Sequence, residues 1–284
     1  MNAFIEQPLS DLDAWVGFFS QADLPVLRHS LTALEKLRAD ADNANSHKLS
    51  DVILQDPLFT LRVLRHIENR RGKRQATDIT TIDQAIMMLG IQPFFRDFAE
   101  LPSVEDRLKS HPQALLGLLK AIQRARRAAH WARDWAVLRR DVDVHEIVLA
   151  ALLHDLAELC MWLFAPTLAL RVRDAQLANP AQRSADVQTA IYGVPLHQLK
   201  LALASAWRLP ALILQLIDHH QADNPRVRNV KLAVDLARHS ANGWDNPALP
   251  DDFAAIRELL HINQETLARQ LSLDDATTKM LAAM

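Results

Sequence analysis

Glycine is scarce in this chain, at only 6 of 284 residues. Hairpin turns and barrel corners depend on glycine, so a protein built from sheets would be unusual with so few. The good helix formers leucine, alanine, arginine, glutamine and glutamate dominate instead. No segment shows a convincing alternation of apolar and polar residues. We therefore predict an all-α, multi-helix fold.

Paired cysteines are absent as well. The single Cys160 excludes an intramolecular disulfide bond and fits a reducing compartment. The N-terminus has acidic residues early and no basic region, so it does not resemble a signal peptide. The longest apolar run, 147–164, contains His154, Asp155 and Glu158, which argue against a membrane span. We expect a cytoplasmic protein with no membrane contact.

A strong net charge is the third absence. The formal charge is −2 at pH 7, so no overall field would attract nucleic acid, and none is expected as a partner. The hydrophobic fraction of 49% supplies ample material for a core and excludes bulk disorder.

Helical periodicity and breaks divide the chain into three regions. A polar stretch before Pro112 marks a boundary between an N-terminal helical lobe, 1–105, and a second helical lobe, 106–242. The remaining residues, 243–284, are expected to form a C-terminal helical extension.

Several helix ends can be predicted from capping residues. Ser46 can cap one helix, and the next starts at Asp56-Pro57, where the missing N–H of proline costs nothing. Gly90 is expected to end another helix. The segment 145–164 is apolar nearly all round, which predicts one central buried helix.

The longest expected helix spans residues 112–140. On it, His130 shares a stripe with Leu119, eleven residues earlier, and Val137, seven residues later. We expect this stripe to face the core.

The second lobe carries an ordered series of histidines and aspartates in expected helices with apolar neighbours. They are His130, His154, Asp155, His197, His219, His220 and Asp235. Imidazole and carboxylate suit Fe, Mn and Zn, and ligands on facing helices can build a metal site in a bundle. One or two such divalent ions would polarise a phosphate and generate hydroxide.

Each of these residues also has a structural interpretation. A histidine in a core helix can be hydrogen-bonded without binding metal, and the pair His219-His220 could cap the last carbonyls of a helix. Asp235 could pair with a neighbouring arginine. The residues alone leave both interpretations open, although their order weakens a chance explanation.

The motifs resemble those of a known family. "ALLHDLAEL" (150–158) is similar to the signature of the HD superfamily, and the flanking segments resemble the HDOD family, the HD-related output domains of bacterial signalling proteins. The segments that carry this resemblance are "LPVLRHSLTALEKL", "LSDVILQDPLFTLRVLRHIEN", "ITTIDQAIMMLG", "GVPLHQLKLALASAWRLPALILQLIDHH" and "VKLAVDLARH". Together they cover about residues 20–242.

The resemblance implies an all-helical regulatory module related to HD phosphohydrolases but without demonstrated hydrolase activity. Such modules are thought to act through protein contacts, often near cyclic-dinucleotide or two-component signalling systems. In the related HD-GYP phosphodiesterases, the pattern that falls here on the seven histidines and aspartates holds metal ions. The resemblance therefore makes those seven residues candidate metal ligands.

The chain also departs from the phosphodiesterase pattern. The Gly-Tyr-Pro loop is missing after His220, and Arg126 stands where those enzymes have a glutamate. These departures favour a non-catalytic module that binds signalling proteins. The basic stretch 69–75 is either a solvated loop, which is the more common case, or a contact for an acidic partner. The alternative is a metal-dependent phosphohydrolase of a nucleotide or cyclic dinucleotide, in which Arg126 or Arg127 would orient phosphate.

Overall fold

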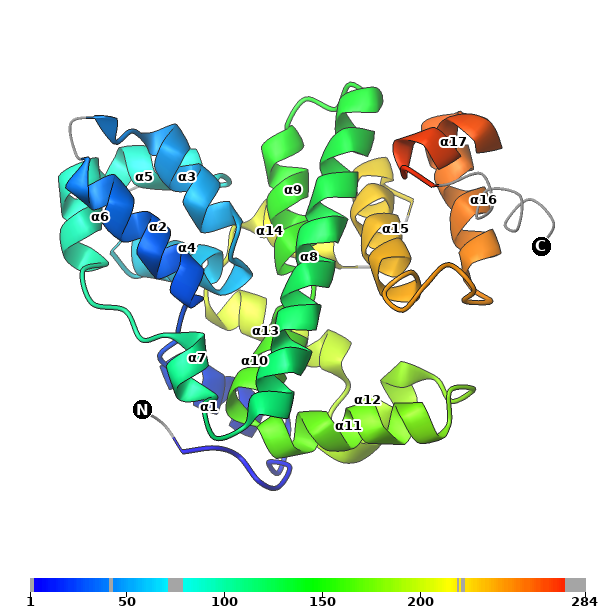
Figure 1. Ribbon diagram of the computed structural model, residues 1–284, viewed down its shortest axis with the longest axis horizontal. Helices are drawn as coiled ribbons and strands as arrows, with labels where there is room; N and C mark the ends of the chain where they lie inside the picture. The colour runs from blue at the N-terminus through cyan, green and yellow to red at the C-terminus, as the bar shows by residue number, and fades with distance from the viewer. Residues whose placement is uncertain (1–2, 41–42, 71–78, 219, 221–222, 274–284) are drawn as a thin grey trace. The chain divides into compact units, whose positions relative to one another are not determined.

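The computed structural model describes residues 3–40, 43–70, 79–218, 220 and 223–273, and it confirms the all-α prediction (Figure 1). Helices make up the regular structure of these residues, which contain no strand beyond one isolated bridge between Val26 and Ser103. The helices before Pro112 are α1 (Leu12–Gln21), α2 (Arg28–Ala39), α3 (Ser46–Leu54), α4 (Pro57–Arg70), α5 (Ile82–Leu89), α6 (Ile91–Asp97) and α7 (Val104–Arg107).

The remaining helices follow in close succession. They are α8 (Pro112–Leu138), α9 (Val144–Leu153), α10 (Leu156–Phe164), α11 (Pro166–Ala178), α12 (Ser184–Tyr192), α13 (Leu196–Ala206), α14 (Ala211–Ile217), α15 (Pro225–His239), α16 (Leu249–Leu260) and α17 (Gln264–Gln270).

The chain forms two compact units, each assembled from two stretches of sequence. The first unit comprises Met1–Gln123 and Asp155–Leu214, and the second comprises Arg124–His154 and Gln215–Met284. The chain therefore passes from one unit to the other three times. The lobes expected from the sequence, with limits at residues 105 and 242, stay a prediction.

Each unit has its own apolar core. In the first unit α1 packs against α13, α3 against α5, and α10 against α11 and α13. Trp15, Phe19, Phe59 and Phe94 are fully buried there. In the second unit α15 packs against both α9 and α16, and Trp135 is fully buried.

The helix ends follow local capping chemistry, with one correction. Asn45, and not Ser46, caps α3, because its side chain accepts a hydrogen bond from the Lys48 N–H at 2.9 Å. The helix α4 begins at Pro57, as predicted. The helix α5 ends before Gly90, whose φ of +83° lies in the region that only glycine adopts without strain.

The apolar segment 145–164 is two helices, so the prediction of a single helix is wrong. The break falls at His154 and Asp155, where Asp155 has φ −97° and ψ 27°. The stretch Val144–Phe164 is long and apolar enough to cross a membrane by length and composition alone, but 83% of an 18-residue window within it is buried inside the protein. Its burial is that of a core element, as predicted.

The stripe of α8 expected to face the core is exposed, which corrects a third prediction. Leu119 is 38% and Val137 60% exposed, and the His130 side chain is 58% exposed. The buried face of α8 is instead rich in alanine, at Ala114, Ala121, Ala125, Ala128, Ala132 and Ala136. Leu118, Ile122, Trp131 and Trp135 are buried as well, so the packed face of α8 combines small and large apolar side chains.

Candidate functional site

The His-Asp pair of the motif lies at the break between α9 and α10. His154 is 3% exposed, and its backbone N–H donates to the Ala151 carbonyl at 3.4 Å as α9 ends. Asp155 is half-buried and stands at the N-cap of α10, where its carbonyl accepts from the Leu159 N–H at 3.1 Å. An acidic side chain is favourable at this helix end. His154 therefore stands at the end of α9, and Asp155 stands at the start of α10.

The first histidine of the pattern, His130, is exposed on α8. Its Nε2 lies 3.4 Å from Asp134 Oδ2, and its Nδ1 lies 3.2 Å from a guanidinium nitrogen of Arg133. The imidazole is therefore placed between an acid and a cation on its own helix.

The last member of the pattern, Asp235, forms an ion pair within α15. Lys231 Nζ lies 2.6 Å from Asp235 Oδ2, one helical turn away, and the carboxylate is 15% exposed. An ammonium group at this distance neutralises the charge that would attract a metal ion.

The other histidines are at exposed positions or outside the described residues. His197 is exposed at the second position of α13, in the first unit. His220 is exposed, and its backbone N–H donates to Asp218 Oδ1 at 3.1 Å. His219 lies outside the described residues. Within the part of the chain that is described, no three His, Cys, Asp or Glu side chains form a group that could hold a metal ion. The seven-residue metal set stays a prediction.

Arg127, one of the two arginines considered for orienting phosphate, has partners inside the second unit. Its Nη2 donates to Ser240 Oγ at 3.0 Å, and its guanidinium lies 4.8 Å from the centre of the Trp131 ring. Burial lowers the pKa of Arg127 from its ordinary value. These contacts hold the guanidinium against α15 and its own helix.

Two polar contacts connect α15 to its neighbouring helices. Arg226 Nη2 lies 2.8 Å from Glu146 Oε2 on α9, and His239 Nδ1 lies 2.6 Å from Asp252 Oδ2 on α16. Sequence reasoning did not find these pairs, because the partners are 80 and 13 residues apart. No local spacing could have indicated them.

A buried carboxylate in the first unit was also missed. Asp56 is fully buried and accepts from Leu27 N at 2.7 Å, Leu58 N at 2.9 Å, Phe59 N at 3.2 Å and Ser30 Oγ at 3.0 Å. Burial raises the pKa of Asp56, and the four donors partly oppose that rise. The Asp-Pro pair signalled the start of α4, but nothing in the sequence indicated the bonds to the start of α2.

An all-α chain with a buried histidine beside an aspartate, at the break between two apolar helices, has the character of a helical HD-type domain. The chain belongs to the HDOD family: a sequence model of the family, described as the HDOD domain, matches residues 24–223. The resemblance predicted from the sequence motifs is thereby confirmed. No functionally curated protein matches the chain.

Solved structures resemble the fold over most of its length. One is the MmoQ response regulator from Methylococcus capsulatus str. Bath, 19% identical, with a TM-score of 0.65 over 88% of this chain and 98% of that one. Another is a virulence factor from Campylobacter jejuni subsp. jejuni, 17% identical, with a TM-score of 0.57 over 95% of each chain. At these identities the similarity establishes a shared fold.

Proposed function

We propose that this protein is a non-catalytic regulatory module of bacterial signal transduction, located in the cytoplasm, that acts through contacts with signalling proteins. Its membership of the HDOD family supports a signalling role, as does its fold similarity to a protein named as a response regulator. Partners of cyclic-dinucleotide or two-component systems are those that the family resemblance implies.

The Lys231–Asp235 ion pair is the observation that carries the non-catalytic part of the proposal. Asp235 is the position at which the phosphodiesterase pattern places its last metal ligand, and here an ammonium group lies 2.6 Å from its carboxylate. A divalent ion bound about 4 Å from that ammonium would be repelled by about 4 kcal/mol per unit charge at an effective dielectric constant of 20. Metal binding at Asp235 would therefore require Lys231 to leave.

Exposed apolar side chains supply surface for protein contacts. Val142 is 94% and Val137 60% exposed in the second unit, and Leu177 is 71% and Met87 66% exposed in the first. Single exposed apolar residues are common on protein surfaces. The first two lie near each other in sequence, at the end of α8 and in the loop after it, which makes this segment the first to test.

An activity assay tests the non-catalytic half of the proposal. The full chain, purified without a histidine tag, is loaded with Mn²⁺, Fe²⁺ or Zn²⁺ under reducing conditions and incubated with cyclic dinucleotides and bis(p-nitrophenyl) phosphate. We expect no turnover by the wild type or by Lys231→Met. Turnover that disappears in a folded His154→Ala/Asp155→Ala variant would contradict the proposal and establish the phosphohydrolase alternative.

A cross-linking experiment tests the partner half. Partners are identified by cross-linking in cells and then measured with purified proteins against Val137→Asp/Val142→Asp and against an exposed control change, Gln182→Asp. We expect specific binding to a signalling protein that only the first variant weakens. If no purified candidate binds the folded wild-type chain, this half of the proposal is wrong.

A further inference from the structure

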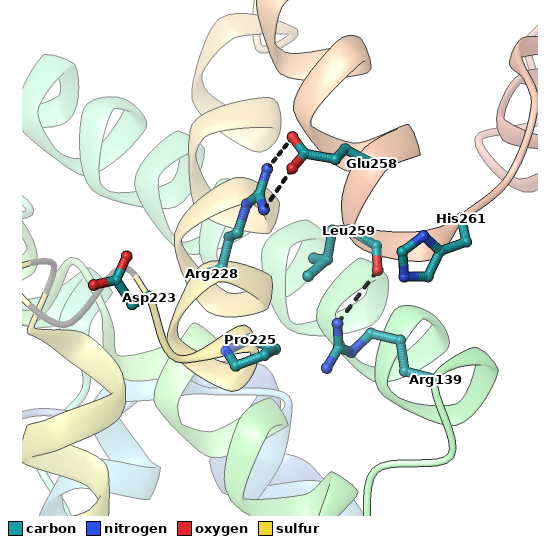
Figure 2. A pocket seen from close by; sticks show the side chains of 7 residues that line it. All are labelled: Arg139, Asp223, Pro225, Arg228, Glu258, Leu259 and His261. Carbon is teal, nitrogen blue, oxygen red and sulfur yellow. Dashed lines mark hydrogen bonds and ion pairs between the residues drawn. The ribbon is translucent and has the colours of Figure 1, made fainter.

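The second unit contains a pocket of about 400 Å³ between the end of α8, the start of α15 and the end of α16 (Figure 2). This volume is within the range of small-molecule sites, about 300–1,000 Å³. Most of its lining residues follow residue 223, where the match to the family model ends. The pocket is therefore separate from the family motifs discussed above.

One end of the pocket presents two basic side chains. Arg139 is only 18% exposed; its Nη1 donates to the Leu259 carbonyl at 3.3 Å and its Nε donates to Asp141 Oδ2 at 3.3 Å. Its Nη2 has no hydrogen-bond acceptor among the described residues. The His261 ring lies on the other side of the same carbonyl (Figure 2) and makes no hydrogen bond within the described structure. Donors are thus available at this end.

The other end presents a carboxylate. Asp223 lies across the pocket from Arg139 (Figure 2) and has neither a hydrogen bond nor an ion pair with any residue that the structure describes. Pro225 and the Leu259 side chain supply apolar surface to the lining.

The remaining charged residues of the lining satisfy each other. Arg228 binds Glu258 through two hydrogen bonds, of 2.6 and 3.3 Å, in the fork geometry that suits a carboxylate. This wall therefore adds no net charge. Arg139 is likewise paired with Asp141, so its end of the pocket offers hydrogen-bond donors, and Asp223 is the charged lining residue that pairs with no described residue.

We propose that the pocket binds a small zwitterionic ligand, with an oxyanion at Arg139 and His261 and an ammonium group at Asp223. A purely anionic ligand would bring its charge near Asp223, and a purely cationic one would leave the donors of Arg139 and His261 without an acceptor. A ligand with both groups gives these donors an oxyanion, pairs its ammonium group with Asp223 and covers the apolar residues with its carbon chain. This inference goes beyond the proposed function, because it gives the module a small-molecule input.

Binding of ω-amino carboxylates to the full chain tests the inference and measures the span of the pocket. Glycine, 4-aminobutanoate and 6-aminohexanoate are titrated by NMR and calorimetry. We expect the best of the three to bind with a dissociation constant of about 1 mM or lower. The analogue that lacks the amine and the analogue that lacks the carboxylate should each bind at least about tenfold more weakly.

Substitutions locate the binding and provide a matched control. His261→Asn and Asp223→Asn should each weaken binding at least about tenfold, since the first replaces the imidazole by a shorter side chain and the second removes the carboxylate charge. His261 and Arg140 both have a left-handed backbone, with φ of 54° and 58°, which asparagine tolerates. Arg140 is exposed and does not line the pocket, so Arg140→Asn should leave binding unchanged.

Three outcomes would overturn the inference. The first is that none of the three compounds binds at a concentration about ten times the expected dissociation constant. The second is that the singly charged analogues bind as tightly as the zwitterion. The third is that Arg140→Asn and His261→Asn weaken binding equally. Thermal unfolding of each variant is measured alongside, and Arg139→Gln, which keeps a donor for the Leu259 carbonyl, serves as a second variant of the basic end. None of these results depends on the protein contacts or on phosphodiesterase activity.

Discussion

The indole ring of Trp162 occupies the space beside Gly117 in which a Cβ atom would stand, with two ring carbons 2.5 Å from that position. The ring is also held by a hydrogen bond from its Nε1 to Glu158 Oε1, at 3.3 Å. Gly117 lies inside α8, where alanine would form the better helix. Packing against α10, and not backbone conformation, therefore explains this glycine.

We predict that Gly117→Ala lowers the free energy of unfolding by about 1–3 kcal/mol, because the rigid ring must move. The control is Gly17→Ala in α1, where nothing lies within 4 Å of the added Cβ. That change should raise the free energy of unfolding by about 0.5–1 kcal/mol. Urea denaturation measures both, and a stabilising effect at both positions would contradict the packing explanation.

Asp56→Ala should be among the most destabilising changes of a polar residue in the first unit. It leaves four buried donors without an acceptor, so we expect a loss of about 3 kcal/mol in the free energy of unfolding. Asp11→Ala is the control, because Asp11 caps α1 through one backbone hydrogen bond, from Ala14 at 2.8 Å, in an exposed position. There the expected loss is about 0.5–1 kcal/mol. Equal losses would show that Asp56 is only a helix cap.

Cys160 should not react with thiol reagents in the folded protein. Burial raises the pKa of its thiol from 9.0 to about 12, so almost no thiolate exists at pH 8. We expect no Ellman reaction in native buffer and one thiol per chain in urea. Since the folded state holds the proton more tightly, this group's contribution to stability is complete below pH 9 and is lost as the pH rises towards 12.

A second thiol at an exposed position controls the reagent. Val142→Cys, at a residue that is 94% exposed, should give one fast-reacting thiol in native buffer while Cys160 stays unreactive. Two fast thiols in that variant would show that the core around Cys160 opens readily.

Arg107→Lys should destabilise the first unit although the charge is kept. The Arg107 guanidinium lies 4.7 Å from the centre of the Phe4 ring and 4.4 Å from that of Phe164, and its Nε donates to the Leu163 carbonyl at 3.0 Å. Lysine cannot stack between two rings, so we expect a loss of about 1–3 kcal/mol. Exposed Arg28→Lys, which keeps its pairing with Asp106, should cost less than about 0.5 kcal/mol. Thermal and urea unfolding compare the two.

Features set by neighbouring residues could be predicted from the sequence. Helix α4 starts at Pro57, because the proline ring fixes the backbone there, and α5 stops before Gly90, because Gly90 has a positive φ. Both effects act within one helical turn. The cap of α3 was predicted one residue late, since Asn45 and Ser46 are both good caps and composition does not distinguish them.

Features that depend on distant residues could not be predicted. The buried face of α8 was expected on the stripe of Leu119, His130 and Val137, whereas its buried residues are alanines together with Leu118, Ile122, Trp131 and Trp135. The break at Asp155 interrupts a pattern that is uniformly apolar, so periodicity gave no sign of it. The family motif marked His154 and Asp155 as special, but it carried no information on the pocket, whose lining joins Arg139 to residues more than 80 positions later. The Lys231–Asp235 pair is different, because its spacing of four residues on one helix is local and could have been predicted.

The three passages of the chain between its two units restrict how the protein can be divided or rearranged. No single cut in the chain separates the two units, because their segments alternate along the sequence. A recombinant fragment that ends with the family match at residue 223 would remove α15 and leave the apolar surface of α9 uncovered. Exchange of the segment from α15 to α17 with that of a relative would also separate α9 from the α15 that it packs against. We therefore expect natural relatives to inherit α9 and α15 together.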